Sequence, residues 1–322
     1  MKTITWGIIG CGNVTEVKSG PAFNLVPNSS LYAVMRRDPK KAKDYASRHH
    51  ITKWYSDADQ LINDPKINAL YIATPPDSHK EYTLKAFKVG KPVYVEKPMA
   101  LNSLEAEIML KASREYSCKL SIAHYRRAQA RFIEIKRLIK ENTLGEITSI
   151  ELKLFLAPSP GIESTWRVNP AISGGGNFHD LAPHQLDLML YFFGEPQKVE
   201  GNSANLLGLY EADDYVTTSI DFSNDINFKG IWDFTGRSEM DQDICIIKGS
   251  KGKVSFSVFS DFCELTLQEK TNALTFDFLP HVQQPMIEQV VKYFRDEAPN
   301  PCSAEDALIV MRMLDKITGK IN

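Results

Sequence analysis

The sequence predicts an α/β domain followed by an α+β domain, and three observations support this. A short apolar strand runs directly into a turn at Gly10 and Gly12, and strands then alternate with helices as far as residue 123. From residue 198 to 279, strands follow one another without long helices between them. Alternation is typical of βαβ units in a doubly wound parallel sheet of the Rossmann type, whereas consecutive strands favour an antiparallel sheet. We therefore expect a dinucleotide-binding domain over residues 1–123. Residues 124–322 should form an α+β domain, a mainly antiparallel sheet with helices on one face, whose C-terminal helix can pack back on the first domain.

Length and composition limit the class of protein. The 322 residues suit about two domains, and a net charge of −2 provides no bulk attraction to nucleic acid or to anionic lipid. No segment approaches the roughly 18 apolar residues that a membrane span needs. The five cysteines are odd in number and scattered, as expected for reduced thiols. We expect a cytoplasmic protein with neither nucleic acid nor membrane as a partner.

The first strand and the turn after it have the pattern of a diphosphate site. The strand covers residues 4–9, Gly10 permits the tight turn, and Gly12 lets the backbone approach the phosphates. Asn13 and Val14 would begin a helix whose free N–H groups and dipole face the anion. Thr15 departs from the small residue usual at the third position. An ordinary strand–turn–helix would show the same pattern, so motifs in the rest of the chain have to distinguish the two interpretations.

The elements that follow in the first domain alternate regularly. Asp38 before Pro39 is a helix start, because Asp caps free N–H groups and Pro fits the first helical position. We expect strands at residues 31–35, 69–73, 92–95 and 119–123, and helices at residues 40–50, 58–63, 78–89 and 103–116.

The second domain has a different pattern. Three glycines at residues 174–176 precede an apolar helix that Gly194 ends. We expect strands at residues 147–156, 215–222, 227–234, 243–248, 253–259 and 263–269, and helices at residues 132–140, 181–193, 284–295 and 304–317.

The end of the second strand bears on the choice of coenzyme. An acidic residue that binds the ribose of NAD is expected about 20 residues past the glycines. Arg36 and Arg37 stand there instead, and Asp38 is explained as a helix cap. Guanidinium groups match the 2′-phosphate of NADP, so NADP is favoured over NAD. The alternative is that both arginines face water.

Two further strand ends face the same edge of the predicted sheet. Thr74 and Pro75, followed by His79, could line the nicotinamide–ribose crevice, although a surface or capping role suits His79 equally. Glu96 and Lys97 precede Pro98, and a lysine at such a turn is a candidate for catalysis. Its alternative is a solvated side chain.

The apolar helix of the second domain carries another pair of candidates. Asp180 and His184 lie four residues apart and share a face, and Asp187 could orient the imidazole. A metal site is the rival interpretation, but the spacing lacks H-E-x-x-H, so we expect no metal. A structural interpretation has Asp180 as a helix cap and His184 in the core.

In this order, the motifs resemble those of the Gfo/Idh/MocA family (glucose–fructose oxidoreductase, inositol dehydrogenase, MocA). The resemblance rests on residues 6–12, Ala73 to Pro76 with His79, Glu96-Lys97-Pro98, and the glycine run with Asp180 and His184. It implies hydride transfer between NAD(P) and a sugar, cyclitol or related alcohol or carbonyl. It also implies that residues 124–322 are a substrate-binding and oligomerisation domain, whose open sheet forms a homodimer or homotetramer. It further implies a cis peptide before Pro98, and Trp166 and Arg167 near the cofactor.

The resemblance also implies a catalytic set of Lys97, His184 and Asp180. His184, whose free pKa is about 6.5, would move the hydroxyl proton. Lys97 would donate to the substrate oxygen, and Asp180 would hold a substrate hydroxyl or stabilise the cationic pair. Alternatives remain open: an enzyme for a non-sugar substrate such as an aromatic diol or a tetrapyrrole, or a non-catalytic NADP-binding regulator. Arg126, Arg127 and Arg131 suggest an anionic or hydroxylated ligand, and a salt-bridged interdomain helix explains them equally well.

Overall fold

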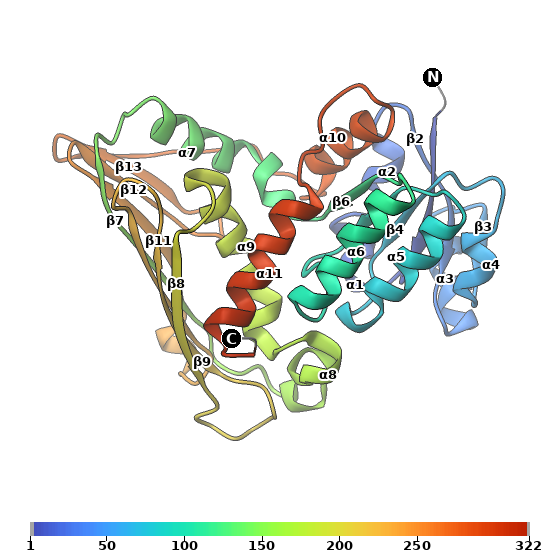
Figure 1. Ribbon diagram of the computed structural model, residues 1–322, viewed down its shortest axis with the longest axis horizontal. Helices are drawn as coiled ribbons and strands as arrows, with labels where there is room; N and C mark the ends of the chain where they lie inside the picture. The colour runs from blue at the N-terminus through green and yellow to red at the C-terminus, as the bar shows by residue number, and fades with distance from the viewer. Residues whose placement is uncertain (1–2, 321–322) are drawn as a thin grey trace. The chain divides into compact units, whose positions relative to one another are not determined.

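A computed structural model describes residues 3–320 of the chain. Its packing divides into two compact units, which are described separately (Figure 1). The first consists of Met1–Gln129 with Phe278–Leu308, and the second of Ala130–Asp277 with Ile309–Asn322. The chain therefore returns to the first unit after completing most of the second, a feature that the sequence-based limits 1–123 and 124–322 do not contain.

The first unit contains the predicted Rossmann sheet. Its six strands are all parallel, in the order β3-β2-β1-β4-β5-β6. The order reverses between β1 and β4, and ligands of such sheets bind at the carboxyl ends of the strands beside this switch point. The strands are β1 (Ile4–Ile9), β2 (Ser29–Met35), β3 (Lys53–Tyr55), β4 (Ala69–Ile72), β5 (Val93–Val95) and β6 (Leu120–Ile122). Strand β3 was not expected, because only one of its three residues is buried.

Helices flank this sheet, and α5 and α6 lie side by side on it (Figure 1). Asp38 caps α3 as predicted, because its carboxylate accepts from the amides of Lys40 at 2.9 Å and Lys41 at 3.2 Å. The helices are α1 (Asn13–Val17), α2 (Ala22–Leu25), α3 (Pro39–Arg48), α4 (Ala58–Ile62), α5 (His79–Lys88), α6 (Ser103–Glu115) and α10 (Gln284–Phe294), with 3₁₀ turns η1 (Pro76–Ser78) and η2 (Tyr125–Ala128).

Helix α10 contributes to the core of the first unit from far along the chain. The buried ring of Trp6 on β1 lies 4.9 Å from that of Phe23 and 5.5 Å from that of Phe294. Aromatic side chains bury large apolar areas, so these contacts stabilise the returning segment on the sheet.

The second unit is built on an open sheet of eight strands in the order β14-β13-β12-β11-β7-β10-β9-β8. Only β7 and β10 pair in parallel, so the sheet is mainly antiparallel, as predicted. The strands are β7 (Ile147–Phe155), β8 (Lys198–Ala204), β9 (Tyr215–Asp221), β10 (Asn227–Asp233), β11 (Gln242–Gly249), β12 (Gly252–Phe256), β13 (Cys263–Leu267) and β14 (Lys270–Ala273). Strands β8 and β14 were not expected. All four residues of β14 are exposed, and β8 lacks regular apolar alternation.

Helices α7 and α9 pack on one face of this sheet (Figure 1). The helices are α7 (Ala130–Lys140), α8 (Pro170–Ser173) and α9 (Gly176–Phe193), with 3₁₀ turns η3 (Ile162–Ser164), η4 (Trp166–Val168) and η5 (Ser238–Met240). Helix α11 (Ala304–Ile317) contributes to both units.

Helix α9 starts earlier than predicted. It begins at Gly176, and Gly175 occupies the N-cap position, whereas the sequence suggested a start at residue 181. Asp180 therefore lies inside the helix, so its interpretation as a helix cap is wrong. On the sheet side, Trp232 of β10 donates a buried hydrogen bond of 2.6 Å to Gln185, which fixes α9 on the strands.

Candidate active site

The glycine turn after β1 has the geometry that a dinucleotide requires. Gly10 has φ +94°, and a Cβ atom there would lie 2.7 Å from Thr74 Cγ2 and 2.8 Å from Thr74 N. Only glycine fits this position. A Cβ atom on Gly12 would meet nothing nearer than the Gly10 carbonyl oxygen at 3.9 Å, so open space borders the start of α1. Because the first amides of a helix lack intrahelical partners, this space suits a diphosphate.

Thr15, the departure from the usual small residue, is accommodated by the turn. Its side chain is fully buried, and its hydroxyl donates a hydrogen bond of 2.8 Å to the Gly12 carbonyl oxygen. The Tyr45 hydroxyl in turn donates a hydrogen bond of 2.7 Å to the Thr15 carbonyl oxygen, which ties the turn to α3.

The two arginines after β2 differ in their surroundings. Arg36 is half-buried, and its Nη1 donates to the Cys11 carbonyl oxygen at 3.3 Å. Arg37 is exposed, and its charge acts on Asp77 beyond β4. Burial raises the pKa of the Asp77 carboxyl, and the positive charge of Arg37 is among the interactions that oppose the rise.

His79 connects two loops of the candidate site. It is fully buried, so the interpretation as a surface residue is wrong. Its Nε2 lies 2.8 Å from the Thr74 carbonyl oxygen and its Nδ1 lies 3.0 Å from that of Pro98. Burial lowers the pKa of His79, and a neutral imidazole donates from one nitrogen only. The ring therefore lies between the loop after β4 and the loop after β5 and donates a hydrogen bond to one of them.

Glu96 and Lys97 follow β5. Glu96 as a whole residue is 6% exposed. Its Oε1 accepts from the Tyr71 hydroxyl and from Gln283 Nε2 at 2.7 Å. Its Oε2 accepts from the Lys97 amide at 3.2 Å. The Lys97–Pro98 peptide is cis, as the resemblance implied. Lys97 itself is half-buried.

In the second unit the structure brings together residues that the sequence suggested separately. Arg167 Nε lies 3.3 Å from Asp180 Oδ2, and the Arg167 guanidinium stacks 4.8 Å from the Trp166 ring centre. His184 lies on α9 one turn after Asp180 and is buried, with its ring centre 5.8 Å from that of Phe259. Trp166, Arg167 and Asp180 thus form one local cluster.

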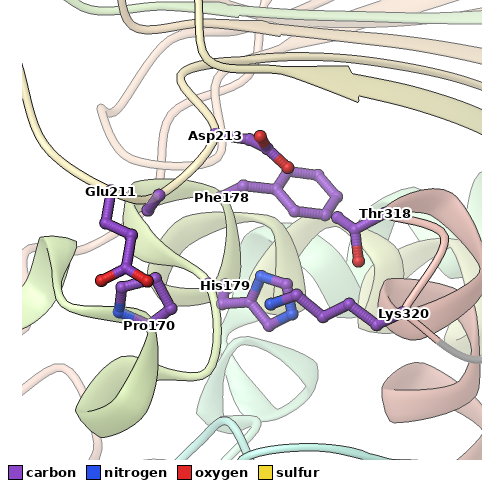
Figure 2. A pocket seen from close by; sticks show the side chains of 9 residues that line it. Pro170, Phe178, His179, Glu211, Asp213, Thr318 and Lys320 are labelled. Atoms are coloured by element: carbon purple, nitrogen blue, oxygen red, sulfur yellow. The ribbon is translucent and has the colours of Figure 1, made fainter. Parts of the chain in front are cut away.

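The second unit also holds a cavity of about 100 Å³. Figure 2 shows the Lys320 side chain reaching across to the ring of His179, and the Lys320 ammonium donates to the Gly174 carbonyl oxygen. Burial, followed by the Lys320 charge, lowers the pKa of His179 to about 3. Within residues 3–320 neither ring nitrogen has a partner with hydrogen-bond geometry, although the nearby Gly175 backbone favours the charged form. The cavity is lined by Pro170, Gly175, Phe178, His179, Glu211, Ala212, Asp213, Thr318 and Lys320.

Two partners of Glu96 were missed by the sequence-based prediction. Tyr71 stands in an otherwise aliphatic strand, and a buried tyrosine needs a hydrogen-bond partner, so its hydroxyl was a usable signal. Gln283 offered none, because it lies 187 positions from Glu96 along the chain.

Residues 3–320 show neither a metal-binding cluster nor a membrane-spanning helix. This part of the chain contains no group of three or more His, Cys, Asp or Glu side chains arranged to hold a metal ion. None of its helices combines the length and the apolar character that crossing a membrane requires.

Comparison with known proteins agrees with this geometry. Residues 4–124 match the model of the oxidoreductase family with an NAD-binding Rossmann fold, and residues 132–255 match that of the Gfo/Idh/MocA C-terminal domain. The chain is 43% identical over 320 residues to Oxidoreductase P35 of Formosa agariphila, covering 98% of both proteins. It is 28% identical over 221 residues to the scyllo-inositol 2-dehydrogenase (NADP(+)) of Bacillus subtilis, which is 68% of this chain and 60% of that enzyme.

A solved structure agrees on the fold over almost the full length. The aldose-aldose oxidoreductase of Caulobacter crescentus matches with a TM-score of 0.87 and 22% identity, over 98% of this chain and 96% of that one. Both family models together cover most of the chain, and the Formosa relative extends over nearly all of it. The chain therefore belongs to the Gfo/Idh/MocA family of NAD(P)-binding oxidoreductases and is an enzyme.

Proposed function

We propose that this enzyme transfers hydride between NADP(H) and a sugar, a cyclitol or a related alcohol or carbonyl compound. The observation that carries this proposal is the likeness over 68% of the chain to a relative named as an NADP-dependent scyllo-inositol 2-dehydrogenase. These substrates share one reacting carbon, which is a CH–OH group in the alcohol and a carbonyl group in the oxidised compound.

The preference for NADP is supported by the end of β2. Arg36 and Arg37 supply two guanidinium groups there, and guanidinium matches phosphate in a bidentate fork. The first carboxylate after them in the sequence, that of Asp38, uses its Oδ1 to cap α3 through two amides. Positive charge therefore stands where NAD enzymes of this fold place an acidic side chain for the ribose hydroxyls.

We assign the chemistry to Lys97, His184 and Asp180. The nicotinamide, when bound, accepts or supplies the hydride. His184 takes the hydroxyl proton during oxidation and returns it during reduction, since an imidazole titrates near neutral pH. Lys97 donates a hydrogen bond to the substrate oxygen, and Asp180, held by Arg167, accepts one from a neighbouring hydroxyl.

We further assign coenzyme binding to residues of both units. Gly10, Gly12, Asn13 and Val14 hold the diphosphate. The nicotinamide end is lined by Thr74, Pro75, His79, Glu96, Trp166 and Arg167.

A substrate panel with matched variants tests this assignment. Sugars, inositols, keto-sugars and an aromatic diol are assayed with NADP(H) and NAD(H). Lys97→Ala and His184→Ala should each lower turnover roughly 10²–10⁴-fold, while NADPH binding, followed by fluorescence, is retained. The exposed Lys88→Ala and His50→Asn are the controls, and they should leave turnover unchanged. Near wild-type rates in both active-site variants, or turnover only with the aromatic diol, would contradict the assignment.

We also propose a homo-oligomer formed through the eight-stranded sheet. Ile231, Ile244 and Ile246 point to the face of this sheet opposite its buried side and are only half-buried. Light scattering on the purified protein tests this proposal, and a monomer at micromolar concentration would contradict it.

For location we propose the cytoplasm. The five cysteines all lie within residues 3–320 and form no disulfide bond there, as in proteins of reducing compartments. Cell fractionation tests this proposal, and recovery of the protein outside the cytoplasmic fraction would contradict it.

A further inference from the structure

Gln283 joins parts of the first unit that are far apart in the sequence. It occupies the N-cap position of α10 in the returning segment Phe278–Leu308, and its side chain is fully buried. Its Nε2 donates to Glu96 Oε1 at 2.7 Å, and its backbone amide donates to the Lys18 carbonyl oxygen at 3.1 Å. The same residue therefore contacts Lys18, the C-cap of α1, and the carboxylate that precedes Lys97. Helix α1 is the one at which we propose that the coenzyme phosphates bind.

The Glu96 carboxylate is held in one orientation. A buried carboxylate is costly unless hydrogen-bond donors surround it. Tyr71 and Gln283 both donate to Oε1, and this leaves Oε2 facing the Lys97 amide at 3.2 Å. The orientation of the Glu96 carboxylate therefore sets the position of the Lys97 backbone amide.

Tyr71 supplies a second link to the same helix. Its hydroxyl lies 3.2 Å from the Ser19 hydroxyl, just beyond α1, while it donates to Glu96. Tyr71 and Gln283 therefore reach Glu96 from different elements, β4 and the returning segment. In the chain that follows the glycine turn, Tyr71 also contacts Ser19 and Gln283 also contacts Lys18.

We infer that Gln283 is a positioning residue for Lys97 and acts through Glu96. This inference rests on the proposed role of Lys97 in hydride transfer. A displacement of about 1 Å at a reacting group can cost roughly 100-fold in rate. Loss of the Gln283 amide frees one lone pair of Oε1, and the carboxylate then turns toward its remaining donors and shifts the Lys97 amide.

Gln129 is the matched control that separates a positioning role of Gln283 from a purely structural role. The Gln129 Nε2 donates at 3.3 Å to the carbonyl oxygen of Val282, the residue next to Gln283. It therefore anchors the same returning segment from a buried position. The Gln129 side chain donates to that segment and not to Glu96.

The test compares Gln283→Leu with Gln129→Leu, since leucine keeps most of the volume and removes the amide. Both variants should lower the melting temperature. Only Gln283→Leu should lower kcat, by about 10- to 100-fold, with NADPH affinity within about threefold of wild type. Equal kcat values for the two variants would overturn the inference.

Tyr71→Phe keeps the ring, removes a hydrogen-bond donor to Glu96 and leaves the returning segment unchanged. This variant therefore tests the inference if Gln283→Leu does not fold. It should also lower kcat, and the double variant should lose less than the product of the two single losses, because both act on one carboxylate. Unchanged kcat in Tyr71→Phe would overturn the inference. If the wild type turns over no member of the panel, or if Lys97→Ala is fully active, the proposed function fails instead.

Discussion

The guanidinium of Arg36 donates a hydrogen bond from Nη1 to the carbonyl oxygen of Cys11, at a distance of 3.3 Å. The contact brings a side chain from the end of β2 against the middle of the glycine turn after β1. A positive charge is thereby held beside the open space at Gly12, where the coenzyme phosphates are expected.

Removal of this charge should change the choice of coenzyme. A hydrogen bond to a charged group contributes about 1.5–3 kcal/mol, so Arg36→Ala should weaken NADPH binding roughly 10- to 100-fold. Arg37→Ala should act in the same direction, and NADH binding should change little in both variants. Fluorescence titration with both coenzymes measures this, and Lys40→Ala on α3 is the control. Equal losses for NADPH and NADH would show that the arginines do not recognise the 2′-phosphate.

Gly10→Ala should damage both folding and coenzyme binding. The new methyl group would meet Thr74 at less than 3 Å, and φ at this position is +94°. Residues forced into such backbone conformations cost about 1–3 kcal/mol, before the steric overlap is added. Urea unfolding and NADPH titration measure the two effects.

Gly90→Ala separates the backbone cost of a positive φ from the cost of the steric overlap at Gly10. Gly90 has φ +69°, and a Cβ atom there meets nothing within 4 Å. It should therefore show only the backbone cost of about 1–2 kcal/mol and normal NADPH binding. Equal destabilisation in both variants would contradict a steric origin at Gly10.

The ion pair between Arg167 and Asp180 should matter more for catalysis than for stability. The Arg167 side chain is 42% exposed, and exposed pairs contribute at most about 1 kcal/mol. Asp180→Asn and Arg167→Ala should therefore change the free energy of unfolding by less than about 1 kcal/mol. Turnover should fall at least about 10-fold, because the proposed substrate contact is lost. A variant with full turnover and a large loss of stability would assign the pair to the fold instead.

His179 should make the protein sensitive to acid. Burial lowers its pKa to about 3 in the folded state, whereas the unfolded value is about 6.5. Above pH 6.5 the ring is neutral in both states and contributes no pH dependence. Below that value the unfolded chain binds a proton that the folded chain does not, so stability falls between pH 6.5 and pH 3.

The variant His179→Gln should remove this dependence. Between pH 7 and pH 5 it should lose about 2 kcal/mol less stability than the wild type, as measured by urea unfolding at each pH. His50→Asn is the control, because His50 is exposed and asparagine tolerates its positive φ of 54°. Parallel stability curves for the wild type and His179→Gln would contradict the prediction.

Much of the fold could be predicted from the sequence, because the signals for its helices and strands are local. The strand before Gly10, the cap at Asp38 and the alternation of strands and helices each depend on residues within a few positions of one another. The two sheets and the family followed from that order. The signals were weakest at β3 and β14, where edge strands obtain their hydrogen bonds from a neighbour and bury few side chains.

Only the tertiary structure decided which of the candidate residues contact one another. It paired Arg167 with Asp180, buried His79 between two carbonyl oxygens, and brought Gln283 to Glu96. The physical reason is that these contacts join side chains to groups on other loops and helices, which lie 13 positions apart for Arg167 and Asp180 and 187 positions apart for Gln283 and Glu96. They arise only when whole helices and strands pack, and the residues beside them in the sequence carry no trace of the partner.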